Sequence, residues 1–148
     1  MEIRSGLKLS QSEVLSLLNR FDDSSDSPLH EGLDFDSYSN KLSDFAYFII
    51  AIEENIQIGF IAYYLNEEGK FAYVPQVVVH KDGRHKGVGH AMFKVLYNVT
   101  NKKYPFLRLE VLKCNVNARA FYEREGFLFI EEHNERLLLE KVYNQMTD

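Results

Sequence analysis

The chain has 148 residues, 45% of them hydrophobic and 26% charged, with a formal net charge of −5 at pH 7. A chain of this length buries roughly 70% of the surface that it exposes when unfolded, so we expect one domain over residues 1–148. The many aromatic residues exclude a disordered chain, and the negative charge argues against nucleic acid as a partner.

The first half of the chain predicts two helices and four strands. EIRSGLK at 2–8 is expected to be a strand, and 11–21 a helix, because its apolar residues recur at helical spacing behind Ser10 or Ser12 as N-cap. A polar loop at 22–37 precedes a short predicted helix at 38–45. The runs 46–54, 56–66 and 70–80 predict strands, joined by turns short enough for antiparallel hairpins.

The second half predicts helices that alternate with strands. Helices are expected at 87–103 and 117–125, and strands at 106–114, 127–132 and 136–144. Early hairpins followed by later crossovers indicate an α/β or α+β fold, with a mostly antiparallel sheet and at least one parallel pair.

Pro75 interrupts the strand predicted at 70–80. Proline has no amide hydrogen to donate to a sheet, so it belongs at an edge or at a bulge. A bulge here would splay the strand from a neighbour and leave backbone groups of residues 76–79 unpaired, where a ligand can dock.

The cysteine and histidine content limits the possible chemistry. The single cysteine, Cys114, excludes an internal disulfide and a multi-cysteine zinc site, and we expect it to be a small core residue. The histidines show no metal-ligand spacing, so no metal is expected. The N-terminus is too polar for a signal peptide and no apolar run is long enough to cross a membrane, which predicts a cytoplasmic protein.

A basic, glycine-containing corner opens the helix predicted at 87–103. Arg84, His85 and Lys86 stand beside Gly87 and Gly89. The first amides of a helix lack intrahelical partners and carry partial positive charge, and glycine allows an anion to come close. We therefore expect a phosphate or pyrophosphate site. A Walker loop is excluded because VGHAM follows Gly87, and a dinucleotide fingerprint is excluded because its third glycine is replaced by Met92.

Two motifs identify a family resemblance. VHKDGRHKGVGHAM fits [RQ]-x-x-G-x-[GA] through Arg84, Gly87 and Gly89. LRLEVLKCNVNARAFYEREGF fits N-x-x-A-x-x-x-Y-x-x-x-G-F through Asn115, Ala118, Tyr122, Gly126 and Phe127. On these residues the chain resembles the GNAT superfamily of acetyl-CoA-dependent N-acetyltransferases. The resemblance implies a mixed, mostly antiparallel twisted sheet of about six to seven strands with about four helices, splayed between strands 4 and 5.

The resemblance also implies a cofactor site for acetyl-CoA as the acyl donor. Backbone groups at Val77, Val78 and Val79 would bind the pantetheine arm. The pyrophosphate would lie on the amides of Arg84, His85, Lys86, Gly87, Val88, Gly89 and His90. Asn115, Ala118 and Phe121 would contact the coenzyme from the following helix. Lys81 is a departure, because many members have proline there.

Acetyl transfer to an amine requires proton transfers, for which the resemblance implies two residues. An alkyl amine of pKa about 10.4 is mostly protonated at pH 7, an obstacle of roughly 4–5 kcal/mol. Tyr122 is the candidate acid, because a phenol of pKa about 10 can donate to a thiolate of pKa about 8.5. Glu110 is the candidate base, on the strand face that alternation assigns to Arg108 and Glu110 rather than to Leu107 and Leu109.

Each of these residues has a simpler structural explanation. Tyr122 could be a core aromatic residue, Glu110 could pair with Arg108, and Asn115 could serve only as an N-cap. Tyr73, Gln76 and, less favourably, His80 are alternative polar residues for the site. Glu31, Asp34 and Asp36 could attract an amine or could simply keep a loop soluble.

The sequence therefore predicts an N-acetyltransferase that uses direct attack by a primary amine, from a small molecule or a peptide. One alternative is acetylation of a protein N-terminus or lysine, because LRLEV resembles members that acetylate ribosomal proteins. Another is a non-catalytic acyl-CoA-binding module. The protein is expected to be a monomer or a homodimer, the latter through the strand RLLLEKVYN.

Overall fold

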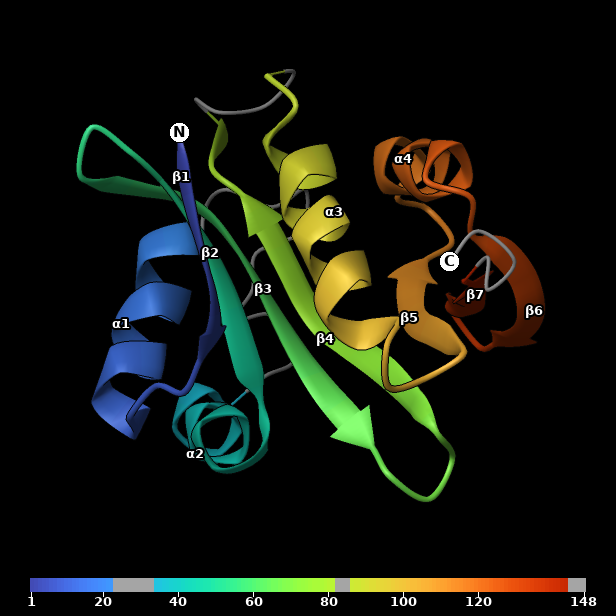
Figure 1. Cartoon of the computed structure of the whole chain (residues 1–148), viewed down its shortest axis with the longest axis horizontal. Helices are drawn as coiled ribbons and strands as arrows, with labels where there is room; N and C mark the ends of the chain where they lie inside the picture. Colours follow the sequence, from blue (N-terminus) through green and yellow to red (C-terminus); the bar gives the residue numbers. More distant parts are fainter. Residues whose placement is uncertain (23–33, 82–85, 144–148) are drawn as a thin grey trace. The chain divides into compact units, whose positions relative to one another are not determined.

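The computed structural model describes residues 1–22, 34–81 and 86–143. Its elements, shown in Figure 1, are β1 Glu2–Leu7, α1 Gln11–Phe21, α2 Phe35–Phe45, β2 Tyr47–Glu53, β3 Ile56–Asn66, β4 Phe71–Val79, α3 Val88–Thr100, β5 Phe106–Leu112, α4 Val116–Arg124, β6 Leu128–His133 and β7 Arg136–Val142. Every predicted helix and strand is present. None of the helices in the described ranges has the length and apolar character needed to cross a bilayer.

Two helix beginnings show how local side chains decide the boundaries. Ser10 caps α1 in a capping box with Glu13, as one of the two predicted caps. The helix predicted at 38–45 begins earlier, at Phe35, because the side chain of Asp34 accepts a hydrogen bond from the amide of Asp36 at 3.1 Å. Asp34 therefore serves as an N-cap of α2.

The strands are hydrogen-bonded in the order β1-β2-β3-β4-β5-β7-β6. β1 with β2, β2 with β3, β5 with β7 and β6 with β7 are antiparallel, whereas β4 with β5 is parallel. The predicted mixed, mostly antiparallel sheet with one parallel pair is confirmed. Because β7 has a strand on each side, it offers no free edge for a second copy, and that part of the dimer prediction is wrong.

The chain divides into two compact units, which we describe separately. The first unit comprises Met1–Tyr64 and Gln76–Leu96, and the second comprises Leu65–Pro75 and Tyr97–Asp148. The chain passes between them within β3, within β4 after Pro75 and within α3 after Leu96. One domain over residues 1–148 stays a prediction.

The core of the first unit forms where α1 and α2 pack on β2 and β3 (Figure 1). Its buried members are Val14, Leu17, Leu18, Phe21, Leu42, Ala46, Phe48, Ile50, Phe60, Ala62 and Val78. At Gly59 of β3, an added β-carbon would lie 3.0 Å from Met92 Cε of α3 and 3.1 Å from the carbonyl oxygen of Val78. The missing side chain therefore allows α3 to approach β3 closely.

The second unit contains the parallel pair of strands and the break predicted at Pro75. The paired residues run from Phe71 and Phe106 to Val74 and Leu109, so the recorded pairing ends directly before Pro75. In β5 the predicted alternation is confirmed, because Leu109 is buried while Glu110 is half-buried. Cys114 is exposed, since β5 ends at Leu112, and the expectation that it is a core residue is wrong.

Candidate functional site

The N-terminal end of α3 belongs to the first unit and has the geometry of an anion site. The amide of Ala91 donates to the carbonyl of Gly87 at 3.0 Å, which is the first bond of the helix. The amides of Val88 and Gly89 come before it, in the first turn, where helix amides have no carbonyl partner within the helix. They form the positive end of the helix dipole, beside the exposed Lys86.

Gly87 is required here by its backbone conformation. Its φ is +78°, a left-handed value that residues with a β-carbon rarely adopt. Among the described residues, no atom lies within 4 Å of the position that its β-carbon would occupy. The predicted residues Arg84 and His85 lie outside the described residues.

The second half of β4 also belongs to the first unit. Val78 is 3% exposed and its side chain is part of the apolar core, whereas Val77 and Val79 are half-buried. This alternation orients Val77 and Val79 away from the side occupied by Val78. Their backbone contact with pantetheine stays a prediction.

Polar residues near β4 have partners that the sequence did not reveal. The hydroxyl of Tyr38 in α2 donates to Oε1 of Gln76 at 3.1 Å, which orients the Gln76 amide. The ring of His80 packs edge-on against Phe21, with centroids 6.2 Å apart. His80 is therefore in contact with the core, and Glu31 lies outside the described residues.

Tyr122 of the second unit is the buried residue of α4, with 7% of its surface exposed. Its ring packs edge-on against Phe121 and Phe127 at centroid distances of 5.4 and 5.5 Å. Burial raises the pKa of the Tyr122 phenol well above its ordinary value, so the hydroxyl keeps its proton at neutral pH. A core aromatic role and a proton-donor role both remain compatible with this position.

The end of α4 explains two further motif residues. The amide of Phe127 donates to the carbonyl of Tyr122 at 3.0 Å, and the amide of Gly126 donates to the carbonyl of Glu123 at 3.1 Å. This reversal requires a φ of +93° at Gly126, which glycine adopts without strain. Phe127 is thereby returned to pack on the ring of Tyr122.

Asn115 begins α4 as an N-cap. Its side-chain Oδ1 accepts a hydrogen bond from the amide of Ala118 at 3.1 Å, which confirms the capping role. Ala118 and Phe121 are half-buried on the same helix. The coenzyme contacts of these residues stay predictions.

Glu110 lies on β5, opposite Leu138 of β7. The expected alternative, a pair with Arg108, is wrong, because Arg108 Nε contacts Glu140 Oε2 at 2.9 Å. The Arg108 guanidinium also lies over the Phe71 ring at 4.8 Å. Within the part of the chain that the structure describes, the Glu110 carboxylate has no hydrogen-bond or ion-pair partner.

Tyr73 shares this polar region of the second unit with Glu110. Burial raises the pKa of Tyr73, the negative charge of Glu110 raises it further, and the positive charge of Arg136 lowers it. Glu110 and Arg136 are thus close enough to influence the Tyr73 phenol. The sequence had named Tyr73 as an alternative polar residue, but it contained no signal for Arg136.

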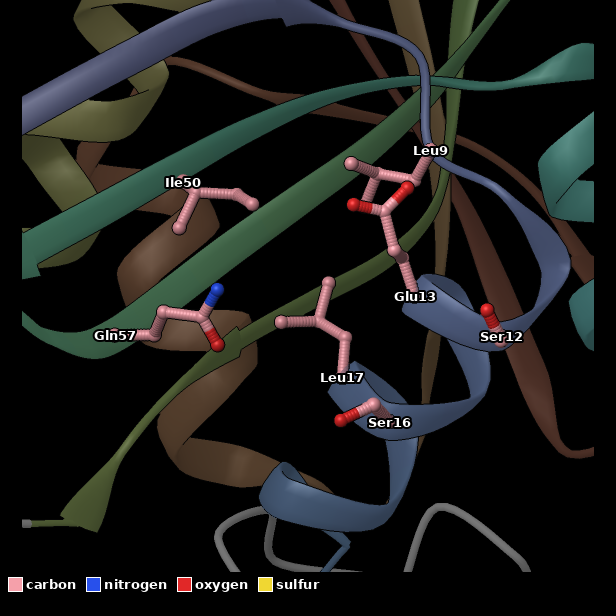
Figure 2. Close-up of a pocket in the computed structure, with 7 residues that line it drawn as sticks. All are labelled: Leu9, Ser12, Glu13, Ser16, Leu17, Ile50 and Gln57. Carbon is pink, nitrogen blue, oxygen red and sulfur yellow. The ribbon is translucent and has the colours of Figure 1, made fainter.

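A cavity of about 280 Å³ lies elsewhere in the first unit, beside α1 (Figure 2). Its lining residues are Leu9, Ser12, Glu13, Ser16, Leu17, Ile50 and Gln57. None of the predicted catalytic or coenzyme-binding residues lines it. The cavity is therefore separate from the candidate site.

Comparisons with solved structures show a shared fold. The PaiA N-acetyltransferase from Thermoplasma acidophilum, solved with coenzyme A, is 21% identical with a TM-score of 0.77, over 97% of this chain and 100% of that chain. The ribosomal-protein-S18-alanine N-acetyltransferase from Escherichia coli is 15% identical with a TM-score of 0.75, over 99% and 98%. The ribosomal-protein-alanine N-acetyltransferase from Brucella melitensis is 18% identical with a TM-score of 0.71, over 97% and 100%.

A comparison with models of protein families matches most of the sequence, whereas a comparison with individual curated proteins finds no match. Residues 12–127 match the model of the acetyltransferase (GNAT) family. This range includes the α3 corner, which is residues 84–89, together with Glu110 and the complete α4 motif, which is residues 115–127. On this match and on the fold, the chain belongs to the GNAT family of acetyltransferases.

Proposed function

We propose that the protein is an acetyl-CoA-dependent N-acetyltransferase that transfers the acetyl group to a primary amine by direct attack on the thioester. The observation that carries the proposal is the buried, protonated phenol of Tyr122 on the helix of the family motif. A non-catalytic acyl-CoA-binding module has no need of a proton donor there, or of a carboxylate such as Glu110.

The first unit would bind the coenzyme. The amides of Val88, Gly89 and His90, with the charge of Lys86, suit the pyrophosphate. Backbone groups of Val77 and Val79 would bind the pantetheine arm, and Arg84 and His85 are proposed to join the phosphate site. Several such contacts must act together, because each exposed contact of an anion with a helix end contributes only about 0.3–1 kcal/mol.

The second unit would supply the proton transfers. Glu110 would take a proton from the ammonium group, directly or through water, so that a neutral nitrogen lone pair attacks the carbonyl carbon. The new C–N bond forms while the C–S bond breaks, and the nitrogen loses its second proton to solvent. The leaving sulfur takes the phenol proton of Tyr122, which solvent then replaces.

The raised pKa of Tyr122 is compatible with this role. Burial disfavours the phenolate, but it also disfavours a thiolate in the same surroundings, since both are anions. Proton transfer depends on the difference between the two pKa values, and a neutral phenol stabilises the developing charge on sulfur by hydrogen bonding.

The acceptor can be a small amine or the amine of a peptide. Two of the compared structures are N-acetyltransferases of ribosomal-protein alanine, which justifies peptides with an N-terminal alanine on an acceptor panel. Small amines are tested beside them, because the proposed attack on the thioester requires only a primary amine.

The test is thiol release from acetyl-CoA with small amines, amino acids and peptides, comparing the parent with Tyr122→Phe and Glu110→Gln. We expect the parent to turn over at least one class of amine. Each variant should lower kcat by roughly 100-fold, the lower end of the range for a general acid or base. Tyr47→Phe is a matched control, because Tyr47 stacks on Tyr63 in the first unit and lies outside the proposed machinery.

Calorimetric titration with acetyl-CoA separates the possible outcomes. If a variant has a lower kcat but binds acetyl-CoA as tightly as the parent, the substitution has impaired the chemical step and not the binding of the coenzyme. Tight binding of acetyl-CoA without turnover of any acceptor would favour the binding module, and turnover that is indifferent to both substitutions would contradict the assigned proton transfers.

A further inference from the structure

The C-terminal end of α4 is tied to two other elements of the second unit through one residue, Glu125. The hydroxyl of Tyr97, in the last part of α3, donates to Glu125 Oε1 at 2.7 Å. The ammonium of Lys141, on β7, donates to the backbone carbonyl of the same residue. Side chain and backbone of Glu125 are therefore held from different directions.

The members of this network also hold one another. The Lys141 ammonium lies over the ring of Tyr97, 4.7 Å from the centroid, and the rings of Tyr97 and Tyr143 meet edge-on at 6.2 Å. Tyr143 in turn shares a hydrogen bond with the hydroxyl of Thr100. Tyr97 is fixed on its face as well as at its hydroxyl, so it offers Glu125 a donor in one place.

The helix α4 depends on contacts of this kind. It has nine residues, and Tyr122 is its buried residue. Helices this short are not stable alone, and their position comes from tertiary contacts. At its beginning, Asn115 caps the helix and Arg119 Nη1 donates to the carbonyl of Lys113 at 2.9 Å, while at its end the network around Glu125 holds it.

The anchored end is adjacent to Tyr122. Glu125 follows Tyr122 by one helical turn, and its amide donates to the carbonyl of Phe121 at 3.0 Å. Burial and the accepting carboxylate of Glu125 raise the pKa of Tyr97, and the charge of a deprotonated Tyr122 adds to this effect. Tyr122 lies on the last turn of α4 and Glu125 is the C-cap of that helix, so contacts that hold Glu125 also hold the part of the helix that carries Tyr122.

We propose that Tyr97 and Glu125 are positioning residues that hold α4 so that the phenol of Tyr122 keeps a single orientation for donation to the departing sulfur. This inference rests on the proposed function, which assigns proton donation to Tyr122. Neither residue needs to touch the substrate. A misplacement of about 1 Å in a reacting group can reduce a rate on the order of 100-fold, so a partial loss of this anchoring should lower kcat roughly 10-fold.

The first test is a double-mutant cycle between positions 97 and 122. Tyr97→Phe should lower kcat roughly 10-fold while the dissociation constant of acetyl-CoA stays unchanged. In a Tyr122→Phe background, the same substitution should have no further effect, because the group that it positions is already gone. Tyr47→Phe serves as the control in both backgrounds.

Glu125 provides a second test, by conservative rescue. Glu125→Gln keeps an oxygen that accepts from Tyr97 and should retain kcat within about 3-fold of the parent, whereas Glu125→Leu should match Tyr97→Phe. Equal losses in Glu125→Gln and Glu125→Leu would indicate a role of the negative charge and would overturn the positioning role.

A readout that needs no turnover separates this inference from the proposed function. With tyrosine labelled at 13Cζ, the Tyr122 resonance, assigned by its absence in Tyr122→Phe, should shift or broaden in Tyr97→Phe and remain in place in Tyr47→Phe. A Tyr122 resonance unchanged in a folded Tyr97→Phe protein would overturn the inference, as would equal kinetic losses in both backgrounds. A parent without turnover, or a fully active Tyr122→Phe, would instead overturn the proposed function.

Discussion

The ammonium of Lys141 lies 2.9 Å from the position that a β-carbon on Gly126 would occupy. Gly126 has a φ of +93° and directly follows Glu125, whose carbonyl accepts from the same ammonium. The backbone conformation therefore requires glycine at this position, and an added β-carbon would displace the flexible end of the Lys141 side chain.

Gly126→Ala should destabilise the protein by about 2–3 kcal/mol. The positive φ contributes roughly 1–2 kcal/mol for any residue with a β-carbon, and displacement of Lys141 from the Glu125 carbonyl adds roughly 0.5–1.5 kcal/mol. Gly6→Ala is the matched control, since Gly6 has a φ of +67° but no atom of the residues that the structure describes lies within 4 Å of its β-carbon position. Urea unfolding measures both variants, and equal losses would show that Lys141 contributes nothing.

The pKa of the Tyr73 phenol should shift in opposite directions when one or the other of its two charged neighbours is removed. Glu110→Gln should lower the pKa of Tyr73, because the carboxylate disfavours the phenolate, and Arg136→Gln should raise it. Burial keeps the pKa above its ordinary value in either variant. Titration of the 13Cζ resonance of Tyr73 measures both shifts, and shifts of the same sign would contradict the arrangement of these three groups.

Stability should fall at alkaline pH through the buried phenol of Tyr143. Burial raises the pKa of Tyr143 to about 12, partly offset by its hydrogen bond with Thr100. The unfolded chain, with a tyrosine pKa of about 10, then loses its proton first. The free energy of unfolding is unaffected below about pH 10 and declines between about pH 10 and 12, by at most about 1.4 kcal/mol per pH unit from this residue.

The alkaline decline can be assigned by substitution. Tyr143→Phe should make the decline of unfolding free energy with pH shallower, and Thr100→Val, which retains the buried phenol, should not. Urea unfolding at intervals from pH 8 to about 11 measures the slopes. An unchanged slope in Tyr143→Phe would assign the effect to other groups.

Lys86→Gln should weaken acetyl-CoA binding by roughly 2- to 5-fold at low salt, as expected for one exposed charge near an anion at a helix end. The effect should shrink as ionic strength rises. Lys94→Gln, which removes an exposed lysine from the middle of α3, is the control. Calorimetry measures the affinity of both variants for acetyl-CoA and for pantetheine, which lacks the pyrophosphate. If Lys86→Gln weakens the binding of pantetheine as much as that of acetyl-CoA, Lys86 does not act on the phosphates.

Much of the fold could be predicted because its signals are local. The residues of α1 were predicted without error, since its apolar spacing and its Ser10 cap lie within the helix or next to it. The beginning of α2 was missed because Asp34 caps it inside a polar stretch that resembles a loop. Cys114 was misplaced because the end of β5 depends on the length of its partner β7, which the apolar run does not report.

The candidate site could be predicted only where its residues are close to one another in the sequence. The α3 corner and the α4 motif are continuous stretches, so their spacing is visible. The partner of Arg108 could not be predicted, because the choice of Glu140 over Glu110 depends on the antiparallel register of β5 and β7.

The sequence by itself determined the element order, both ends of α1 and the family, because helices and turns are decided by residues a few positions apart. Only the tertiary structure decided that Tyr97, Glu125 and Lys141 meet at the end of α4, and that Glu110 is left without a partner in the described residues while Arg108 pairs with Glu140. These contacts join residues distant in the chain. They arise from packing and strand register, which no local pattern encodes.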